Sequence, residues 1–489
     1  MISFVISIIA LILGYIFYGA FVNKVFGPDP KAVTPAVSKA DGVDFVPMPA
    51  WKVYMIQFLN IAGTGPIFGA IMGAKFGPSS YLWIVLGCIF AGAVHDYFCG
   101  MLSMRSGGAS MPDIVGSQLG RTTKWFVLVF SIILLMLVGT VFVFSPAQIL
   151  SDLTGGGSTQ SCMIWVGVVF LYYIIATLLP IDKVIGRIYP LFAFSLLFMA
   201  FALMIGLFVK WPSIPELWQG LGNRGPSIGL EGQAIFPCLF ITIACGALSG
   251  FHATQSPMMA RCLKNESLGR PIFYGAMITE GVVALIWAAV SSYFFFDGGA
   301  AEVGSTIKAS APQVVTAVSR SWLGLLGGIL AILGVVAAPI TSGDTALRSA
   351  RLIFADMTHI PQDNKLKRLA LAMPIFILVA LLLWYNISDE NGFNNIWRYF
   401  GWANQTLAVF MLWTITVYLA RHKRGHYYLM GLLPATFMSA VCISFICTQS
   451  IGFNMPDEVT PYIAGITAAA SLVLYYIWYY RSGEAKKEK

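Results

Sequence analysis

Two apolar segments of this chain are interrupted by small residues near their middles. The first interruption is Ala62–Pro66 (AGTGP), within residues 52–73, and the second is Cys245–Gly250 (CGALSG), within residues 233–258. Such an interruption frees backbone N–H and C=O groups that hydrocarbon cannot satisfy, so it must face protein, water or a ligand. Paired interruptions in two halves of a membrane protein point to the central site of a secondary transporter.

The interruptions have the chemistry to bind a carboxylate. Pro66 suits the start of an outer half-helix, because its missing N–H would be unpaired there, and neighbouring N–H groups at the positive helix end attract anions. Close packing of membrane helices, which also uses small residues, is the alternative explanation. In a half-helix beginning near Gly250, the side chains of His252, Gln255 and Ser256 would lie on one face. The predicted substrate-binding residues are Gly63, Thr64, Gly65, Pro66, Gly246, Ser249, Gly250, His252, Gln255 and Ser256.

A second set of oxygen atoms is suited to a small cation. Thr341 and Ser342 end the ninth apolar segment, and the Ala338 carbonyl lies one turn earlier. Carbonyl groups of Ala62 and Gly65 would complete an all-oxygen shell, which hard cations such as Na⁺ require. The alternative is that both hydroxyls bond back to carbonyls of their own helix.

Ionisable side chains inside a membrane are costly and usually functional. His95 and Asp96 in the third segment, and His252 beside the second interruption, are candidates for proton coupling because imidazole titrates near physiological pH. Glu280 lies within the eighth segment and joins this predicted charge network.

Two further pairs of polar residues lie near segment ends. Asp344 has Arg348 four residues later, which predicts an ion pair at the inner end of a helix. Asn404 and Gln405 lie near the outer end of the eleventh segment and are predicted to line or gate an outer vestibule.

Composition places all these residues in a membrane protein. The 489 residues are 57% hydrophobic and 11% charged, with mean hydropathy +0.76, whereas soluble domains carry about 25% charged residues. We expect about thirteen crossings of about 20 residues each. They lie near 2–22, 52–73, 81–104, 123–145, 161–180, 187–209, 233–258, 271–296, 321–345, 368–386, 400–420, 428–449 and 461–480.

The interrupted segments are the second and the seventh, so they run in opposite directions across the membrane. Two five-helix units of opposite topology are the inverted repeat of a LeuT-type fold. The predicted class is therefore an all-α polytopic membrane protein with a 5+5 repeat and extra peripheral helices, forming a single membrane domain over 1–489. Its parts are a peripheral span at 1–22, a cytoplasmic loop at 23–51, the two repeats at 52–209 and 233–420, and two C-terminal spans with a basic tail at 421–489.

The distribution of charge predicts the orientation. If the loop after the first segment is cytoplasmic, 24 of the 30 basic residues lie inside, and the outer side holds Lys75, Lys210, Arg224, Lys308, Arg320 and Arg398. The positive-inside rule then puts the N-terminus outside and the C-terminus in the cytoplasm. The net charge of +8 therefore does not indicate nucleic acid. The first segment lacks a basic start and an Ala-x-Ala site, so we expect it to be retained, and the cysteine spacing predicts neither disulfides nor zinc.

Six stretches resemble the carbon starvation protein A (CstA) family of bacterial inner-membrane transporters. They begin at the residues given and read GTGP from Gly63, GAVHDY from Gly92, SGFHATQSP from Ser249, GAMITEG from Gly275, TSGDTALR from Thr341 and FGWANQT from Phe400. The resemblance implies uptake of peptides or pyruvate during nutrient limitation, driven by an ion gradient, and a LeuT-type architecture. Many members are longer at the C-terminus.

The resulting hypothesis is a symporter that imports a small carboxylate-bearing nutrient by alternating access, without a cofactor. The partners expected are the substrate and the lipid bilayer. Peptide versus pyruvate, H⁺ versus Na⁺, and the oligomeric state stay open. A polytopic membrane enzyme using His95, Asp96 and His252 is an alternative, but the chain lacks the HExxH signature. A transporter-like nutrient sensor is the third reading.

Overall fold

The computed structural model describes residues 1–42, 44–154, 156, 158–178, 181–230, 233–358, 360, 365–389 and 392–484, and these residues are mainly helical. The first half contains α1 (Ile2–Leu13), η1 (Gly14–Tyr18), α2 (Gly19–Phe26), α3 (Pro35–Ser38), α4 (Ala50–Ile61), η2 (Gly65–Gly69), α5 (Ala70–Gly73), η3 (Ala74–Phe76), α6 (Ser79–Gly87), η4 (Cys88–Gly92), α7 (Ala93–Arg105), α8 (Met111–Leu119), α9 (Arg121–Thr154), α10 (Thr159–Leu178) and α11 (Ile181–Lys210). The second half contains η5 (Leu217–Gln219), η6 (Gly225–Ile228), α12 (Ile235–Thr242), α13 (His252–Ala260), η7 (Glu266–Leu268), η8 (Arg270–Tyr274), α14 (Gly275–Phe296), α15 (Gly299–Glu302), α16 (Ala311–Thr358), α17 (Lys365–Ser388), α18 (Gly392–His422), η9 (His426–Tyr428), α19 (Leu429–Thr448), η10 (Asp457–Val459) and α20 (Thr460–Arg481).

Ten helices in the described part of the chain are long and apolar enough to cross a membrane. The pair Ala50–Ile61 and Gly65–Phe76, bent by 51°, makes eleven if it is one crossing. The remaining predicted crossings coincide with the separate helices α12 and α13 and with the 48-residue helix α16. The prediction of an all-helical, multi-span membrane protein is confirmed.

Both predicted interruptions are present. The helix α4 ends at Ile61 and its continuation begins at Gly65. The second interruption separates α12, which ends at Thr242, from α13, which begins at His252. Within it Gly246 has φ of +89°, a left-handed backbone that a side chain would strain.

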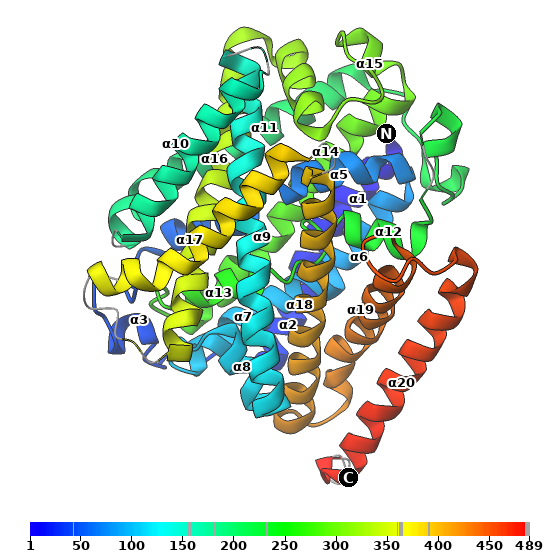
Figure 1. Cartoon of the computed structure of the whole chain (residues 1–489). Helices are drawn as coiled ribbons and strands as arrows, with labels where there is room; N and C mark the ends of the chain where they lie inside the picture. Colours follow the sequence, from blue (N-terminus) through cyan, green and yellow to red (C-terminus); the bar gives the residue numbers. More distant parts are fainter. Residues whose placement is uncertain are drawn as a thin grey trace.

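The helices form one bundle with α7 and α13 near its middle (Figure 1). The long helices α9 and α16 pack against each other, and α20 lies at the edge beside α19 (Figure 1). The two chain termini lie at opposite ends of the bundle (Figure 1). Several outer helices expose large apolar side chains, which suits contact with lipid; examples are Ile164, Leu171, Phe194, Phe201, Ile377, Leu381, Ile466 and Leu474.

Gly250, in the second interruption, provides a test of this packing. A Cβ atom there would lie 2.1 Å from the carbonyl oxygen of Asn404 and 2.4 Å from the backbone nitrogen of Ala408. We expect G250A to cost about 1–3 kcal/mol of stability, because overpacking would push α18 away. The measurement is the melting temperature of the purified protein in detergent.

Gly167 on α10 is the matched control, because a Cβ added there meets nothing within 4 Å. We expect G167A to melt at or slightly above the wild-type temperature. Equal melting of G250A and the wild type would contradict the close approach of α18 to the interruption.

Candidate functional site

The two interruptions touch each other in the interior of the bundle. A Cβ atom on Gly65 would lie 2.3 Å from the Sγ atom of Cys245, and one on Gly246 would lie 2.4 Å from the Cβ of Ala284. Only glycine permits these approaches without a shift of the neighbouring chain. The predicted substrate residues at the two interruptions are thereby brought to one place.

Asn404 on α18 is hydrogen-bonded to residues of the second interruption. Its Oδ1 accepts hydrogen bonds from the backbone N–H of Phe251, at 2.6 Å, and from the Ser249 hydroxyl, at 3.1 Å. The neighbouring Gln405 donates from Nε2 to the carbonyl oxygen of Phe240 on α12, at 2.9 Å. Both side chains are fully buried. Their contacts join α18 to both halves of the broken helix, and their role as an outer gate stays a prediction.

The predicted polar face of α13 is turned toward protein. Ser256 accepts a hydrogen bond from Nε2 of Gln57 on α4, at 3.1 Å. Gln255 donates from Nε2 to the hydroxyl of Thr254, at 2.8 Å, and its Oε1 has no hydrogen-bond partner among the described residues. This face therefore links the two broken helices and keeps one buried acceptor free.

Two buried polar residues near the first interruption, Gln57 and Asn60, were not among the predicted site residues. Gln57, Asn60 and Thr64 are fully buried, and the prediction included only Thr64. In the described part of the chain, both amide atoms of Asn60, the hydroxyl of Thr64 and Oε1 of Gln57 lack hydrogen-bond partners. Thr64 follows the end of α4 at Ile61, whereas Gln57 and Asn60, three residues apart, share one face of that helix. That spacing was readable from the sequence, and it supplies donors and acceptors beside the interruption.

Of the two predicted hydroxyl ligands on α16, Ser342 faces the first interruption, whereas Thr341 is hydrogen-bonded to carbonyl groups of its own helix. Ser342 donates from Oγ to the carbonyl oxygen of Leu59, at 2.8 Å, one turn before Ala62. The Thr341 hydroxyl lies 2.8 Å from the carbonyl oxygen of Ala338. A hydroxyl that donates a hydrogen bond keeps lone pairs for a cation. The oxygen set therefore fits Na⁺ chemically, and ion binding there stays a prediction.

Four ionisable side chains form one buried cluster beside the second interruption. The Asp96 carboxylate lies 2.8 Å from Nδ1 of His95 and 2.9 Å from Nδ1 of His252. On the other side of the His252 ring, Nε2 lies 3.6 Å from Oε2 of Glu280. All four side chains have zero exposure. The two places predicted for proton coupling are therefore a single site.

The charges of this cluster leave a place for one proton. Two buried carboxylates repel each other, and an imidazolium between them relieves that repulsion. Nε2 of His252 and both carboxylate oxygens of Glu280 have no hydrogen-bond partner among the residues described. Because these atoms face each other, a proton bound between them would gain a partner on each side.

A thiol adjoins this cluster. Donor atoms of Cys245, His252 and Glu280 lie within 4.8 Å of one another, a spacing that a metal ion could bridge. The Cys245 Sγ instead lies 3.5 Å from the Ser249 hydroxyl. One protonated His252 between the carboxylates of Asp96 and Glu280 would leave the cluster with a net charge of −1, and its role as a proton site stays a prediction.

The predicted pair on α16 is more deeply placed than a helix end would suggest. Asp344 and Arg348 are fully buried, with Oδ1 and Nη2 4.0 Å apart. The hydroxyl of Tyr189 on α11 donates to Oδ2 of Asp344, at 3.0 Å, and Nη2 of Arg348 donates to the carbonyl oxygen of Ala176, at 2.9 Å. The pair therefore ties α16 to α10 and α11.

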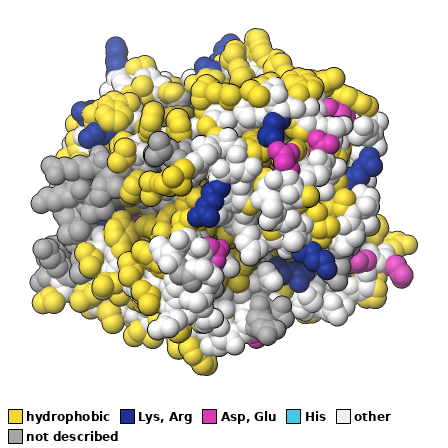
Figure 2. Space-filling model, turned by 90° about the horizontal axis from the view of Figure 1, so that it is seen from above, with side chains coloured by type: hydrophobic (Ala, Val, Ile, Leu, Met, Phe, Trp, Pro, Cys, Tyr) yellow, Lys and Arg dark blue, Asp and Glu magenta, His cyan; other side chains and the backbone are white. Residues whose placement is uncertain are grey.

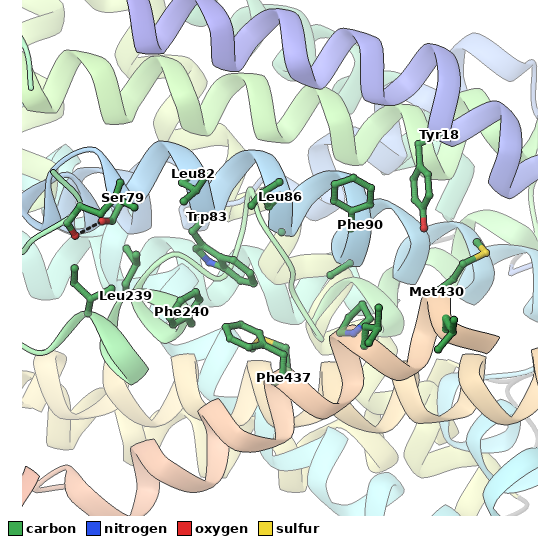
Figure 3. Close-up of a pocket in the computed structure, with 18 residues that line it drawn as sticks. Tyr18, Ser79, Leu82, Trp83, Leu86, Phe90, Leu239, Phe240, Met430 and Phe437 are labelled. Carbon is green, nitrogen blue, oxygen red and sulfur yellow. Dashed lines mark hydrogen bonds between the residues drawn. The ribbon is translucent and has the colours of Figure 1, made fainter. Parts of the chain in front are cut away.

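A large groove lies on the opposite side of α12 and is apolar (Figure 3). It has a volume of about 590 Å³ and is lined by side chains of α6, η4, α12 and α19, including Phe90 and Phe437. Trp83 at its wall donates from Nε1 to the carbonyl oxygen of Ile243, at 2.8 Å. This bond caps the end of α12, but the groove lacks the polar groups that a carboxylate would need.

Sequence comparison relates the chain to bacterial membrane proteins. It is 48% identical to an uncharacterized membrane protein of Haemophilus influenzae, over 60% of this chain and 91% of that protein. It is 26% identical to the peptide transporter CstA of Escherichia coli, over 94% of this chain and 82% of that protein. It is 25% identical to the pyruvate/proton symporter BtsT of the same organism, over 91% and 80%.

Solved structures establish the fold. A manganese transporter of Eremococcus coleocola matches 92% of this chain and 99% of its own, with a TM-score of 0.59 and 11% identity. MhsT in complex with L-phenylalanine matches 86% and 98%, with a TM-score of 0.57 and 13% identity. The predicted LeuT-type architecture is confirmed. The sequence model of the carbon starvation protein CstA family matches residues 1–165, 148–322 and 325–445, so the chain belongs to that family.

Proposed function

We propose that this protein is a proton-coupled secondary transporter that imports a small carboxylate-bearing nutrient across the bacterial inner membrane. The observation that carries the proposal is the buried Asp96–His252–Glu280 cluster directly beside the paired helix interruptions. The named relatives, a peptide transporter and a pyruvate/proton symporter, support the same class. The N-terminus would lie outside and the C-terminus in the cytoplasm.

The substrate carboxylate would bind between the two interruptions. The N–H group of Phe251, at the start of α13, donates a hydrogen bond to Oδ1 of Asn404. Asn60 and Thr64 supply further buried hydrogen-bonding atoms across the gap. A substrate that satisfies these groups removes the cost of leaving them unpaired.

Proton binding and substrate binding would be coupled because both use groups at the start of the same short helix, α13. His252 is the first residue of α13, and Phe251 immediately precedes it. A proton on the His252–Glu280 pair offsets the negative charge of the cluster, and an anion can then approach α13 at lower electrostatic cost. When the proton leaves toward the cytoplasm, the repulsion returns and the substrate is expelled.

Sodium coupling is the second candidate. Its support is the contact between Ser342 and the Leu59 carbonyl, which brings α16 against the first interruption. An enzyme acting on a membrane substrate is a weaker proposal, because the named relatives are transporters.

The deciding experiment is uptake into proteoliposomes of labelled pyruvate and labelled dialanine, with the H⁺ and Na⁺ gradients varied separately. We expect accumulation that follows the pH gradient and persists without Na⁺. Accumulation that requires Na⁺ would instead support the Thr341–Ser342 site. Absence of gradient-driven accumulation of either substrate would refute the proposal.

Replacing Glu280 tests the coupling. E280Q keeps the shape of a protonated carboxyl but cannot release a proton. We expect accumulation driven by a pH gradient to fall at least about tenfold, which corresponds to about 1.4 kcal/mol, while substrate counterflow without a gradient continues and loses its pH dependence.

Glu458 is the matched control, because it is an exposed carboxylate at the start of the last crossing. E458Q should transport like the wild type. Normal pH-driven accumulation by E280Q would remove Glu280 from the mechanism.

Asn60 tests the substrate site. We expect N60A to raise KM about tenfold for the transported substrate, because a hydrogen bond to a charged group contributes about 1.5–3 kcal/mol. The measurement is the initial rate of uptake over a range of substrate concentrations. The exposed Gln160 is the control; Q160A should leave KM unchanged. An unaltered KM in N60A would place the carboxylate elsewhere.

A further inference from the structure

A second cavity, with charged and polar groups in its lining, lies beside the end of α12. Its volume is about 420 Å³. Its lining comes from the outer end of the first broken helix, the loop before α12, the end of α12, α18 and α19: Met72, Lys75, Phe76, Asn223, Leu230, Gln233, Ile241, Thr242, Asn394, Trp397, Arg398, Gly401 and Phe445. We call this cavity the vestibule.

The vestibule leads toward the proposed central site. Its lining includes Ile241 and Thr242, the last two residues of α12 before the interruption. It also includes Gly401, which lies one helical turn before Asn404 on α18. Because Asn404 holds the N–H of Phe251 at the start of α13, the vestibule and the site share a wall. A solute in the vestibule is therefore next to the break.

The charged groups on the vestibule lining are both positive. Lys75 and Arg398 line it from two different helices, and the described residues of the lining include no Asp or Glu. In the described part of the chain, neither cation has a carboxylate within 4.0 Å. Arg398 is held by neutral partners, with Nη1 3.0 Å from the Ser450 hydroxyl and Nη2 2.9 Å from Oε1 of Gln449. Lys75 lies over the ring of Phe295, with Nζ 5.1 Å from its centroid.

Among the described lining residues, this arrangement gives the cavity a positive potential without a neighbouring carboxylate to offset it. Clefts with charges of one sign and low-dielectric walls focus the field and concentrate counter-ions. Met72, Phe76 and Trp397 supply apolar wall, and Asn223 and Asn394 add polar residues to the lining. Seen from above in Figure 2, basic side chains lie at several separate places on this face of the molecule, some of them beside acidic ones.

The central site differs from the vestibule in charge, because it contains buried carboxyl groups. Its ionisable groups include the carboxylates of Asp96 and Glu280, and the buried Arg348 is engaged with Asp344 and the Ala176 carbonyl. An anion approaching from outside therefore gains no attraction from a fixed cation at the interruptions. The attraction must come from the vestibule, which it meets first.

We propose that the vestibule is an entry subsite for a small monocarboxylate anion, held by Lys75 and Arg398 before it passes to the interruptions. This inference rests on the proposed transport function and narrows its substrate. A monocarboxylate such as pyruvate carries only negative charge, so both cations attract it. The free ammonium of a zwitterionic peptide is repelled by the same two cations.

The test compares the wild type with K75Q, R398Q and the double variant in proteoliposomes, using pyruvate and dialanine as labelled substrates. We expect the KM for pyruvate to rise about threefold in each single variant and about tenfold in the double variant, with kcat unchanged, because the cations act on encounter rather than on translocation. The wild-type KM for pyruvate should also rise with ionic strength, and that dependence should disappear in the double variant.

Two controls separate charge from structure. K308Q removes an exposed Lys that does not line the vestibule, and it should leave KM unchanged. R398K keeps the charge but loses the paired hydrogen bonds to Ser450 and Gln449, and it should keep a KM near the wild-type value. If the double variant does not fold, the single variants and the salt dependence of the wild type decide the question.

The outcomes distinguish this inference from the proposed function. An unchanged pyruvate KM in both Gln variants, or an equal rise in KM for dialanine, would overturn the subsite while gradient-driven uptake still stood. Uptake of dialanine but not of pyruvate would overturn the choice of anion. Loss of proton-driven accumulation in E280Q with a normal KM would leave the subsite intact, because it tests a different step.

Discussion

The contact between the two interrupted helices is the constraint on which the rest of the structure depends. Gly65 lies against Cys245 so closely that neither chain has room for another atom. At the same depth, Gly250 lies against the backbone of α18. These approaches bury the ends of the helices together, and their free polar groups then have to find partners in one small volume.

Burial at this place sets the electrostatics of the site. Asp96 and Glu280 are held in the interior with His252 between them, and charges in such surroundings are costly unless they are paired. The pairing uses the first residue of α13, which is the half-helix whose N-terminus faces the other interruption. In the proposed mechanism, protonation and solute binding would therefore act on the same short helix, which would be the physical basis of coupling.

The sequence was sufficient to predict the interruptions, the opposed repeats and the approach of Ser342 to α4, because small-residue runs and residue order carry that information. The joining of His95 and Asp96 with His252 and Glu280 was not readable, since it depends on how α7, α13 and α14 pack. Gln57 and Asn60 are different: their helical spacing was visible and could have been used. Asn404 needed the structure, because its contact with Phe251 joins helices far apart along the chain.

The separation of charge along the pathway explains why the co-transported proton would be obligatory. In the proposed entry subsite, Lys75 and Arg398 would stabilise an anion before it reaches the interruptions. At the interruptions the neighbouring fixed groups are Asp96 and Glu280, so an anion moved there without a proton would meet repulsion in a medium of low dielectric constant. The energy of that step falls only when the cluster has gained a proton. Binding of the two solutes is then linked, and linkage is reciprocal: the anion raises the affinity of the cluster for its proton by the same factor.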